Sequence, residues 1–516
     1  MKQMAAKLNK YEVRFYFLTW IIGVLYSMYH VYLAGDYFYT YGDFNYFTDE
    51  WIWLGRKHDN YDYEWNIWIE FMKKLAPWIV VQLLISQILK HTKTPKTMIY
   101  SWYIIVTSTF LWNFCGFGGI LYLLISPCIV CLLTSLQSKK LVYVVHITIL
   151  VVFQYSSLFS EFMFSYINVD STTDFLLTLA FFWLQLKGMD CSIDNINNYK
   201  HENLIGFFKN IIQCTAYCWY LPNLFFGPHI LYHKFIRSVD EPGEKLTLHR
   251  IIIHLLNLLR FTFWIFFTKL MFHFVYSTAL SHRPHVVEKL NAWAFYGMGY
   301  CMGQYFCNKY VVFYGIAGEI SRMDGIDAPP PPKCIGRIHL YSDMWKYFDR
   351  GLYEFLVRCI YGPISEFNIP FRKFVASFIT FVFIYVWHGV HKFVLIWTVL
   401  NFLGVMIVTI ANSIGNSPLY IKWQQKFLSP RNTRRFNCIL ATPLLAVSAV
   451  SNFYFFGGEI IGNLYMYRLF HDSPMSIFIL MFILYCCCQV STEMKLIEHR
   501  KGYNKNCDEF INKKLN

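Results

Sequence analysis

Two ionisable residues stand in aromatic and apolar stretches of this sequence. His388 ends the apolar run 374–388, and Asp349 lies in the aromatic-rich segment 344–356. An imidazole titrates near neutral pH, so it can take a proton from a nucleophile and return one to a leaving group. Ionisable side chains inside membrane-like stretches are rare and usually functional. The two residues therefore suggest an acid–base pair inside a membrane protein.

Each of the two residues also has a structural interpretation. A single histidine in an apolar run is more often a hydrogen-bonding residue than a catalytic one. Asp349 could pair with Lys346, three residues earlier on a helix, whereas the adjacent Arg350 would face another way. His391 follows His388 by one helical turn, but nearby carboxylate and cysteine ligands are lacking in the sequence, which disfavours a zinc site.

Other residues have weaker claims to a function. Trp345 and Trp387 flank the two ionisable residues, although such bulky side chains most simply pack or lie at a membrane interface. Asn452 is a polar amide in the apolar run 436–456 and needs a partner, which is either another helix or a substrate carbonyl. The apolar segment 217–228 contains two prolines and a glycine. Broken helices at membrane depth often line a cavity.

The elements that must position these residues are membrane helices. Hydrophobic residues make up 56% of the 516 residues and charged residues only 15%, against about 25% charged in soluble domains. Several apolar runs are shorter than the ~20 residues of a straight span, or contain Pro and Gly, so some are re-entrant or tilted. We expect an all-α polytopic membrane protein with about ten to twelve transmembrane and re-entrant helices, forming one integral-membrane domain over residues 1–516. The apolar runs are 15–34, 76–90, 98–113, 117–135, 141–160, 172–186, 204–230, 250–279, 292–319, 371–388, 393–412, 436–456 and 474–490.

The charge pattern predicts the orientation of the chain. The net charge is +14, but Lys and Arg lie in short segments between the apolar runs, as in cytoplasmic loops. Without a basic soluble domain, a nucleic-acid partner is excluded. The basic N-terminus precedes a retained first span, and the acidic, aromatic segment 35–66 is expected on the opposite, luminal side.

Most of the fifteen cysteines lie in apolar runs and indicate packing rather than a disulfide scaffold.

Two further segments are not spans. Four consecutive prolines at 329–332 enforce an extended connection, after which Trp345, Phe348 and Leu352 recur at helical spacing. One amphipathic helix with Asp349 beside its apolar stripe is therefore predicted. The basic tail 491–516 is expected in the cytosol, on the same side as the N-terminus.

The end of the tail carries a possible sorting signal. Lys513 and Lys514 precede the last two residues and match the dilysine retrieval signal of the endoplasmic reticulum. Such signals are recognised by receptors and do not anchor the protein. The alternative is a solvated basic tail.

These motifs together resemble the membrane-bound O-acyltransferase (MBOAT) superfamily, and within it hedgehog acyltransferase, most nearly in its insect form. The resemblance rests on Trp387-His388-Gly389, on the segment from Cys334 to Asp349 and beyond, on Leu221-Pro222 with Gly227-Pro228, and on the segments 395–403 and 451–462. It is strongest over 295–465, and residues 35–66 look divergent. The resemblance implies an MBOAT core of helices that encloses a catalytic tunnel.

The resemblance also implies an activity. Palmitate would pass from palmitoyl-CoA to the N-terminal cysteine of the hedgehog signalling protein, at the endoplasmic reticulum membrane and also in the Golgi. His388 and Asp349 would be the catalytic pair. Trp345, Trp387 and Asn452 would be substrate-binding residues, with Trp345 near the acyl-CoA and Asn452 near the reacting thioester.

A cofactor is implied in the same way. The cysteine that can hold haem in this family falls on Cys334, and thiolate ligation of haem is chemically sensible. A free or S-acylated cysteine is the alternative.

Chemical reasoning supports the implied reaction but leaves rivals open. An α-amino group has a pKa near ~8, so modest base assistance suffices at neutral pH. We expect Asp349 to hold the incoming amino terminus and His388 to act as acid or base at the thioester. The rivals are an MBOAT with a hydroxyl acceptor on a peptide or lipid, a transporter with a proton relay, and a regulator that binds acyl-CoA without forming product. The absence of visible inverted repeats counts against the transporter.

Overall fold

The fold is built almost entirely from helices. The computed structural model describes residues 6–92, 94–155, 169–198, 204–241 and 246–500. Eight helices in this part of the chain are long and apolar enough to cross a membrane: α1 (together with α2), α3, α4, α7, α10, α18, α20 and α21. The protein is therefore a multi-pass membrane protein, as its composition predicts. The tail residues Lys513 and Lys514 lie outside the described residues.

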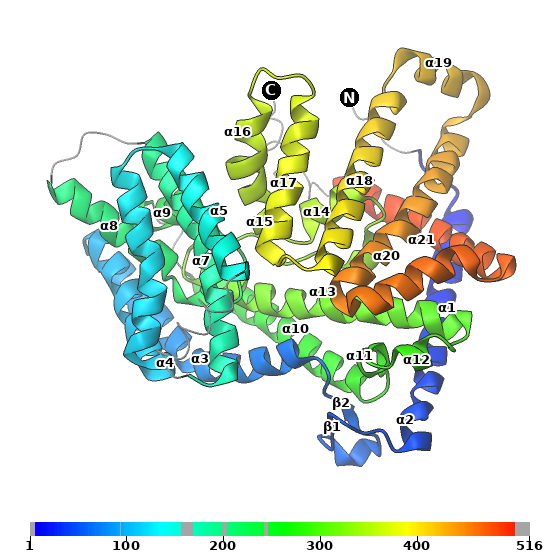
Figure 1. Cartoon of the computed structure of the whole chain (residues 1–516), viewed down its shortest axis with the longest axis horizontal. Coiled ribbons are helices and arrows are strands. Elements are labelled where there is room, and N and C mark those ends of the chain that lie inside the picture. Colours follow the sequence, from blue (N-terminus) through cyan, green and yellow to red (C-terminus); the bar gives the residue numbers. More distant parts are fainter. Residues whose placement is uncertain (1–5, 93, 156–168, 199–203, 242–245, 501–516) are drawn as a thin grey trace.

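The elements follow in chain order (Figure 1). The first half contains α1 (Lys10–Ala34), α2 (Asp36–Tyr41), β1 (Phe47–Thr48), η1 (Ile52–Leu54), β2 (His58–Asp59), α3 (Tyr63–His91), α4 (Lys96–Ser135), α5 (Lys139–Tyr155), α7 (Ser171–Asn197), α8 (Leu204–Cys218), η2 (Leu221–Asn223), α9 (Tyr232–Asp240) and α10 (Leu248–Phe272). The second half contains α11 (Ser277–Ser281), α12 (Pro284–Val287), α13 (Ala292–Met323), η3 (Ile335–Arg337), α14 (Tyr341–Tyr347), α15 (Arg350–Phe355), the π-helical turn η4 (Leu356–Tyr361), α16 (Gly362–Ser365), α17 (Arg372–His388), α18 (Lys392–Gly415), α19 (Pro418–Phe427), α20 (Pro430–His471) and α21 (Pro474–Arg500).

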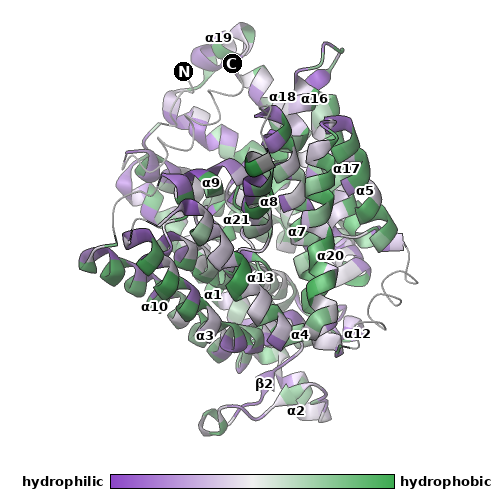
Figure 2. Ribbon diagram, turned by 90° about the vertical axis from the view of Figure 1, so that its left-hand side faces the viewer, coloured by the Kyte–Doolittle hydropathy of each residue, from purple (hydrophilic) through white to green (hydrophobic). Residues whose placement is uncertain are grey.

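The apolar runs of the sequence become the long helices. Figure 2 shows hydrophobic residues along the length of α17 and α20. Apolar segments of this kind form helices because a backbone in an apolar surrounding must satisfy its own hydrogen bonds. The runs 98–113 and 117–135 form a single helix, α4, that kinks at Gly116, where φ is 71°. A second kink lies in α20 at Gly458, where φ is 76°. Both values are in the left-handed region that glycine tolerates.

The run 204–230 is an exception to this agreement. Its helix, α8, ends at Cys218, and the chain continues through the short turn η2 into irregular, buried backbone up to α9. Pro222 lies within η2 and Pro228 follows it. A proline supplies no backbone N–H and disrupts a helix interior. Only the first half of this run is therefore helical.

Residues 35–62 of the acidic segment 35–66 form a small cap at one end of the molecule, and the last four residues of the segment begin α3. The strands β1 and β2 pair antiparallel, with Phe47 opposite Asp59. Arg283, which precedes α12, binds Asp43 at 2.6 Å and fastens the cap to the helices. The cap lies at the opposite end of the molecule from α19 (Figures 1 and 2).

The helix α13 crosses the middle of the structure and packs against α1, α10, η2 and α20. It contributes residues to two large apolar clusters. One gathers around α3, α4, α7 and the irregular segment after α8, and the other around α13, α17, α18 and α20. The helix α13 therefore connects the two clusters.

Candidate active site

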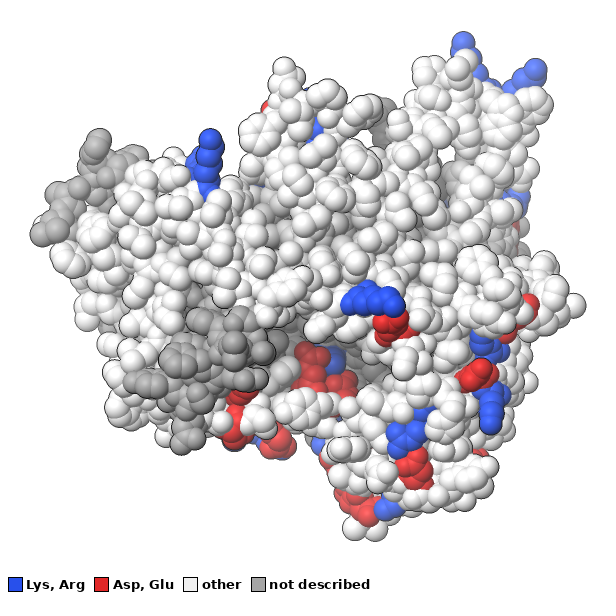
Figure 3. Space-filling view, viewed as in Figure 1, with Lys and Arg blue, Asp and Glu red and all other residues white. Residues whose placement is uncertain are grey.

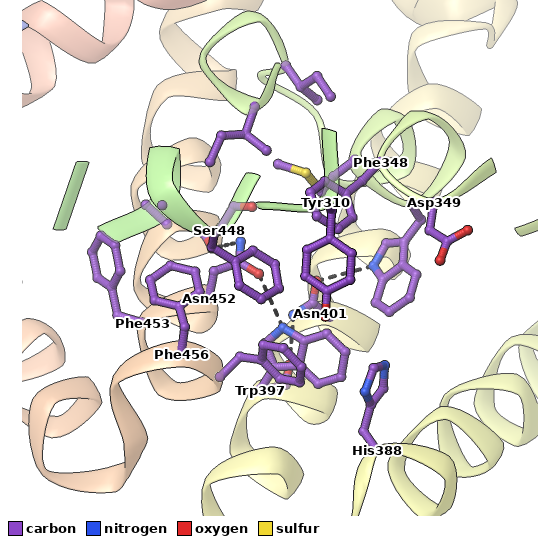
Figure 4. A pocket seen from close by; sticks show the side chains of 18 of the residues that line it. Tyr310, Phe348, Asp349, His388, Trp397, Asn401, Ser448, Asn452, Phe453 and Phe456 are labelled. Atoms are coloured by element: carbon purple, nitrogen blue, oxygen red, sulfur yellow. Dashed lines mark hydrogen bonds between the residues drawn. The ribbon is translucent and has the colours of Figure 1, made fainter. Parts of the chain in front are cut away.

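A cavity of about 440 Å³ lies between the helices, and its walls come from α1, α3, α5, α7, α13, η3, α14, α15, α17, α18, α20 and α21. The volume falls within the ~300–1,000 Å³ usual for small-molecule sites. All five residues predicted to act in catalysis or substrate binding line it. They are His388, Asp349, Trp345, Trp387 and Asn452. Figure 4 labels His388, Asp349 and Asn452 among the lining residues.

Asp349 does not lie within a continuous amphipathic helix, and that prediction is wrong. The helix stops after Tyr347, and Asp349 is the N-cap of the next helix, α15, with extended backbone angles (φ −119°, ψ 90°). Its carboxylate accepts the backbone N–H of Leu352 at 2.9 Å and the hydroxyl of Tyr314 at 3.1 Å. Aspartate is a favoured N-cap because its oxygen satisfies a free N–H of the first turn. The neighbouring Arg350 binds Glu354 at 2.7 Å instead.

His388 is the last residue of α17. The helix stops there because Gly389 adopts φ 111°, which only glycine adopts easily. Aromatic rings surround the imidazole edge-on, with centroids 5.2 Å away for Trp397 and 5.1 Å away for Phe455. Within the described chain no residue hydrogen-bonds this ring, so both ring nitrogens stay available for a ligand. The described residues also contain no group of three or more His, Cys, Asp or Glu that could hold a metal ion.

A chain of hydrogen bonds fixes the tryptophan walls of the cavity. Trp345 donates from Nε1 to Oδ1 of Asn401 at 3.2 Å, and Asn401 donates to the carbonyl oxygen of Trp397 at 2.8 Å. Trp397 in turn donates from Nε1 to Oδ1 of Asn452 at 3.2 Å, and Asn452 donates to the carbonyl oxygen of Ser448 at 2.9 Å. Figure 4 shows Trp397, Asn401, Ser448 and Asn452 on the wall that faces His388. The partner that Asn452 needs is thus a neighbouring helix, α18, and the residue still faces the cavity.

The sequence argument missed Asn401, Trp397 and Tyr314. Asn401 is a polar amide in the apolar run 393–412, the same signal that singled out Asn452. It could have been found on that ground. Tyr314 could not, because its role depends on the approach of Asp349 from a distant segment.

Two other predicted features also border the cavity. Trp387 donates from Nε1 to the carbonyl oxygen of Phe182 at 3.4 Å, which fixes its ring against α7. From the irregular segment after α8, Phe226 lines the cavity. The prediction that a broken helix lines a cavity is therefore confirmed for this residue.

Cys334 lies outside the cavity wall, but the next two residues, Ile335 and Gly336, line it. The thiol is exposed, and its Sγ lies 3.6 Å from Oε1 of Gln304. An open thiol at the edge of a cavity has the access that a haem ligand needs. An S-acylated cysteine needs the same access, so the placement fits both interpretations.

Comparison with known proteins agrees with this arrangement. The model of the membrane-bound O-acyltransferase family matches residues 129–451, a region that contains both His388 and Asp349. The chain is 36% identical over 328 residues to the protein-cysteine N-palmitoyltransferase Rasp of Drosophila melanogaster, a match that covers 63% of this chain and 64% of Rasp, just under two thirds of its length. It is 25% identical over 442 residues to the mouse protein-cysteine N-palmitoyltransferase HHAT, covering 84% of this chain and 88% of that relative. The chain belongs to the membrane-bound O-acyltransferase family.

Proposed function

We propose that this protein transfers palmitate from palmitoyl-CoA to the α-amino group of the N-terminal cysteine of a hedgehog signalling protein. The observation that carries the proposal is a largely apolar cavity among membrane helices that holds both a carboxylate, Asp349, and an imidazole, His388. Apolar walls suit an acyl chain, and the reaction needs an acid and a base. The names of two relatives, both protein-cysteine N-palmitoyltransferases, support the same chemistry.

In the proposed reaction the amine nitrogen attacks the thioester carbonyl carbon. An amide bond forms, the carbon–sulfur bond breaks, and coenzyme A leaves as its thiol. Asp349 holds the amino terminus and takes the proton that the amine loses. His388 supplies the proton that the departing sulfur gains. The α-amino group has a pKa of ~8, so a fraction of the amine is already neutral at neutral pH and a weak base suffices.

The remaining wall residues position the donor. Trp345 and Trp387 flank the reacting groups, and each indole N–H is already bonded to protein, so these rings offer rigid apolar faces to the acyl-CoA. Asn452 lies near the thioester in this arrangement, with both ends of its amide held by protein groups. Rigid walls keep the reacting atoms aligned, which lowers the entropic part of the barrier.

The proposal includes a location and a cofactor. We place the protein in the endoplasmic reticulum membrane with both termini in the cytosol, so that palmitoyl-CoA enters from the cytosol and the acceptor from the lumen. Haem at Cys334 remains a prediction. If Cys334 binds haem, the purified protein should show a haem absorption band, and Cys334→Ala should abolish that band. A hydroxylamine-sensitive acyl group on Cys334 would contradict haem binding.

The test is a transfer assay with purified protein in detergent. Palmitoyl-CoA and a peptide that begins with cysteine should give an amide-linked palmitoyl peptide by mass spectrometry, and an N-acetylated copy of the peptide should give none. His388→Ala should lower the rate by ~10²–10⁴-fold. His391→Ala is the matched control, because this exposed histidine stacks on Phe393 at 5.5 Å and does not line the cavity.

Each rival makes a different prediction in the same assay. Faster transfer to a serine-bearing peptide or a lipid hydroxyl would identify a hydroxyl acceptor and contradict the proposal. Proton or solute flux in proteoliposomes without transfer would identify a transporter, and tight binding of palmitoyl-CoA without product a regulator. Full activity of His388→Ala would overturn the role of that residue.

A further inference from the structure

The proposed reaction has a base for the amine and a proton donor for the sulfur, but no group yet for the carbonyl oxygen of the thioester. When the amine nitrogen forms its bond to the carbonyl carbon, one electron pair of the C=O bond moves onto that oxygen. The negative charge there is stabilised best by a hydrogen-bond donor that is already in position. Such a donor must line the cavity and must not be bonded to the protein itself.

The donors on the tryptophan wall of the cavity are largely used within the protein. The indole N–H of Trp397 donates to Asn452 at 3.2 Å. The amide nitrogen of Asn401 donates twice, to the carbonyl oxygen of Trp397 at 2.8 Å and to the hydroxyl of Ser451 at 3.3 Å. The amide nitrogen of Asn452 donates to the carbonyl oxygen of Ser448 at 2.9 Å. This wall therefore has few donors left for a substrate oxygen.

Tyr310 carries a donor that the protein leaves unused. It lines the cavity from α13, and no group in the described part of the chain hydrogen-bonds its hydroxyl. Its ring packs on Phe306, with centroids 4.9 Å apart, and on Phe348 at 5.7 Å. It also meets the rings of Tyr314 and Trp68 nearly at right angles, at 5.1 and 5.9 Å. These four ring contacts hold the phenol in place, so its hydroxyl is positioned before a substrate binds.

The phenol of Tyr310 lies between the two proposed catalytic groups. One helical turn further along α13, the next tyrosine of the cavity wall donates its hydroxyl to Asp349. In the other direction, Phe306 contacts Phe455 at 5.7 Å, and Phe455 lies 5.1 Å from the ring of His388. Figure 4 shows the ring of Tyr310 projecting into the space between Asp349 and the hydrogen-bonded wall. A thioester held between the acid and the base would present its carbonyl oxygen to this hydroxyl.

The surroundings keep the hydroxyl of Tyr310 protonated. The carboxylates of Glu64 and Asp349 line the same cavity, and the described residues that line it include no Lys or Arg. Figure 3 shows acidic side chains gathered in a hollow on one face of the molecule. Burial and nearby negative charge both disfavour a phenolate. The same charge would destabilise an unassisted oxyanion, which makes a donor at that oxygen more important.

We propose that Tyr310 is a catalytic residue whose hydroxyl donates a hydrogen bond to the carbonyl oxygen of the thioester as that oxygen becomes negative. The electron pair moves onto the oxygen while the nitrogen–carbon bond forms. It returns when the carbon–sulfur bond breaks and the sulfur takes its proton from His388. Tyr310 keeps its own proton throughout. This inference rests on the proposed acyl transfer and adds the group that stabilises its transition state.

The test is Tyr310→Phe, which removes one oxygen atom and keeps the ring contacts. The variant should lower kcat for palmitate transfer to the cysteine peptide by ~10²–10³-fold. KM for palmitoyl-CoA, KM for the peptide and the melting temperature should stay unchanged, because the hydroxyl binds no protein group. The factor lost should be the same at every pH at which the protein is active, since a hydrogen-bond donor does not exchange its proton. Wild-type kcat in this variant would overturn the inference, and so would a loss confined to KM or one that varies with pH.

The matched control is Tyr305→Phe on the same helix. The hydroxyl of Tyr305 donates to the carbonyl oxygen of Val275 at 3.1 Å, and the residue does not line the cavity. This variant should unfold at a lower temperature and keep the kcat of the wild type. A loss of kcat as large as that of Tyr310→Phe would show that any hydroxyl removed from α13 disturbs the site, and would overturn the assignment.

Two further measurements separate this inference from the proposed acceptor. If cysteine peptides accept no palmitate, the proposed function fails. The two proteins are then compared in hydrolysis of palmitoyl-CoA and in transfer to a hydroxyl acceptor, because both reactions form the same oxyanion, and equal rates would refute the role of Tyr310.

Binding of analogues tests the same hydrogen bond without turnover. A palmitoyl-CoA analogue with a tetrahedral phosphonate in place of the carbonyl group should bind the wild type at least about tenfold more tightly than Tyr310→Phe. A ketone analogue, in which CH₂ replaces the sulfur, should bind both proteins with similar affinity. Equal affinity of the two proteins for the phosphonate would refute the role of Tyr310.

Discussion

Asp349 caps a helix and is the proposed base of the reaction, and a pair of substitutions can distinguish these two roles. Its carboxylate caps α15 through the N–H of Leu352 and accepts the hydroxyl of Tyr314. It is also the proposed base. Asparagine is as good an N-cap as aspartate, but it cannot take up the proton. Asp349→Asn should therefore keep the fold and lose the reaction.

The magnitudes follow from these contacts. Asp349→Ala removes the cap, which costs about 0.5–2 kcal/mol, and one further hydrogen bond worth about 0.5–1.5 kcal/mol. Asp349→Asn keeps the cap, and the Tyr314 hydroxyl can accept from the new amide instead of donating. We expect both variants to lose transfer activity by ~10²–10⁴-fold, and only the alanine variant to unfold at a lower temperature.

The assay is palmitate transfer to a cysteine peptide, together with thermal unfolding in detergent. Tyr314→Phe is the matched control, because it removes only the hydroxyl that donates to Asp349. An asparagine variant with more than a tenth of wild-type activity would refute the role of Asp349 as base. An asparagine variant as unstable as the alanine variant would refute the capping argument.

Three other changes test separate parts of the structure. Asn401→Leu leaves the partly buried Nε1 of Trp345 without its acceptor, which should cost about 0.5–1.5 kcal/mol of stability and raise KM for palmitoyl-CoA; an unchanged KM would contradict the positioning of that tryptophan. Gly351→Ala places a methyl group 2.2 Å from the carbonyl oxygen of His229, so it should displace α15 and lower both activity and melting temperature, and full activity would show that the contact can relax. Burial raises the pKa of Asp59 in the cap from 3.8 to about 7, so the folded state disfavours the ionised form and stability should fall as pH rises from about 4 to about 7. Asp59→Asn should remove this dependence in melting curves recorded across that range, and an identical dependence in both proteins would contradict the assignment.

Much of this molecule follows from the sequence alone. The low charge content and the apolar runs determine a helical membrane protein, because a chain in lipid must satisfy its backbone hydrogen bonds within each segment. Residue chemistry also singles out His388, Asp349 and Asn452, because polar groups in apolar stretches need a specific reason to be there. The structure places all three on one cavity.

The sequence argument failed where two local signals predict different secondary structure for the same residues. Helical spacing of apolar residues runs through Asp349 and predicts one helix, but the preference of aspartate for an N-cap divides it into α14 and α15. By contrast, the two prolines and the glycine of the segment 217–228 predict a break in the apolar run 204–230, and its helix α8 ends at Cys218. Periodicity alone does not decide between such signals, since the outcome depends on the neighbours that the segment packs against.

Tertiary structure alone decided which residues meet. Trp345 reaches Asn401, Trp397 reaches Asn452, and Glu64 shares a cavity with Asp349 from the far end of the chain. No spacing in the sequence encodes these contacts, because they arise from how α3, α13, α18 and α20 pack. The sequence therefore determined the fold class and the candidate residues, whereas packing determined the walls of the cavity and the hydrogen-bond chain within them.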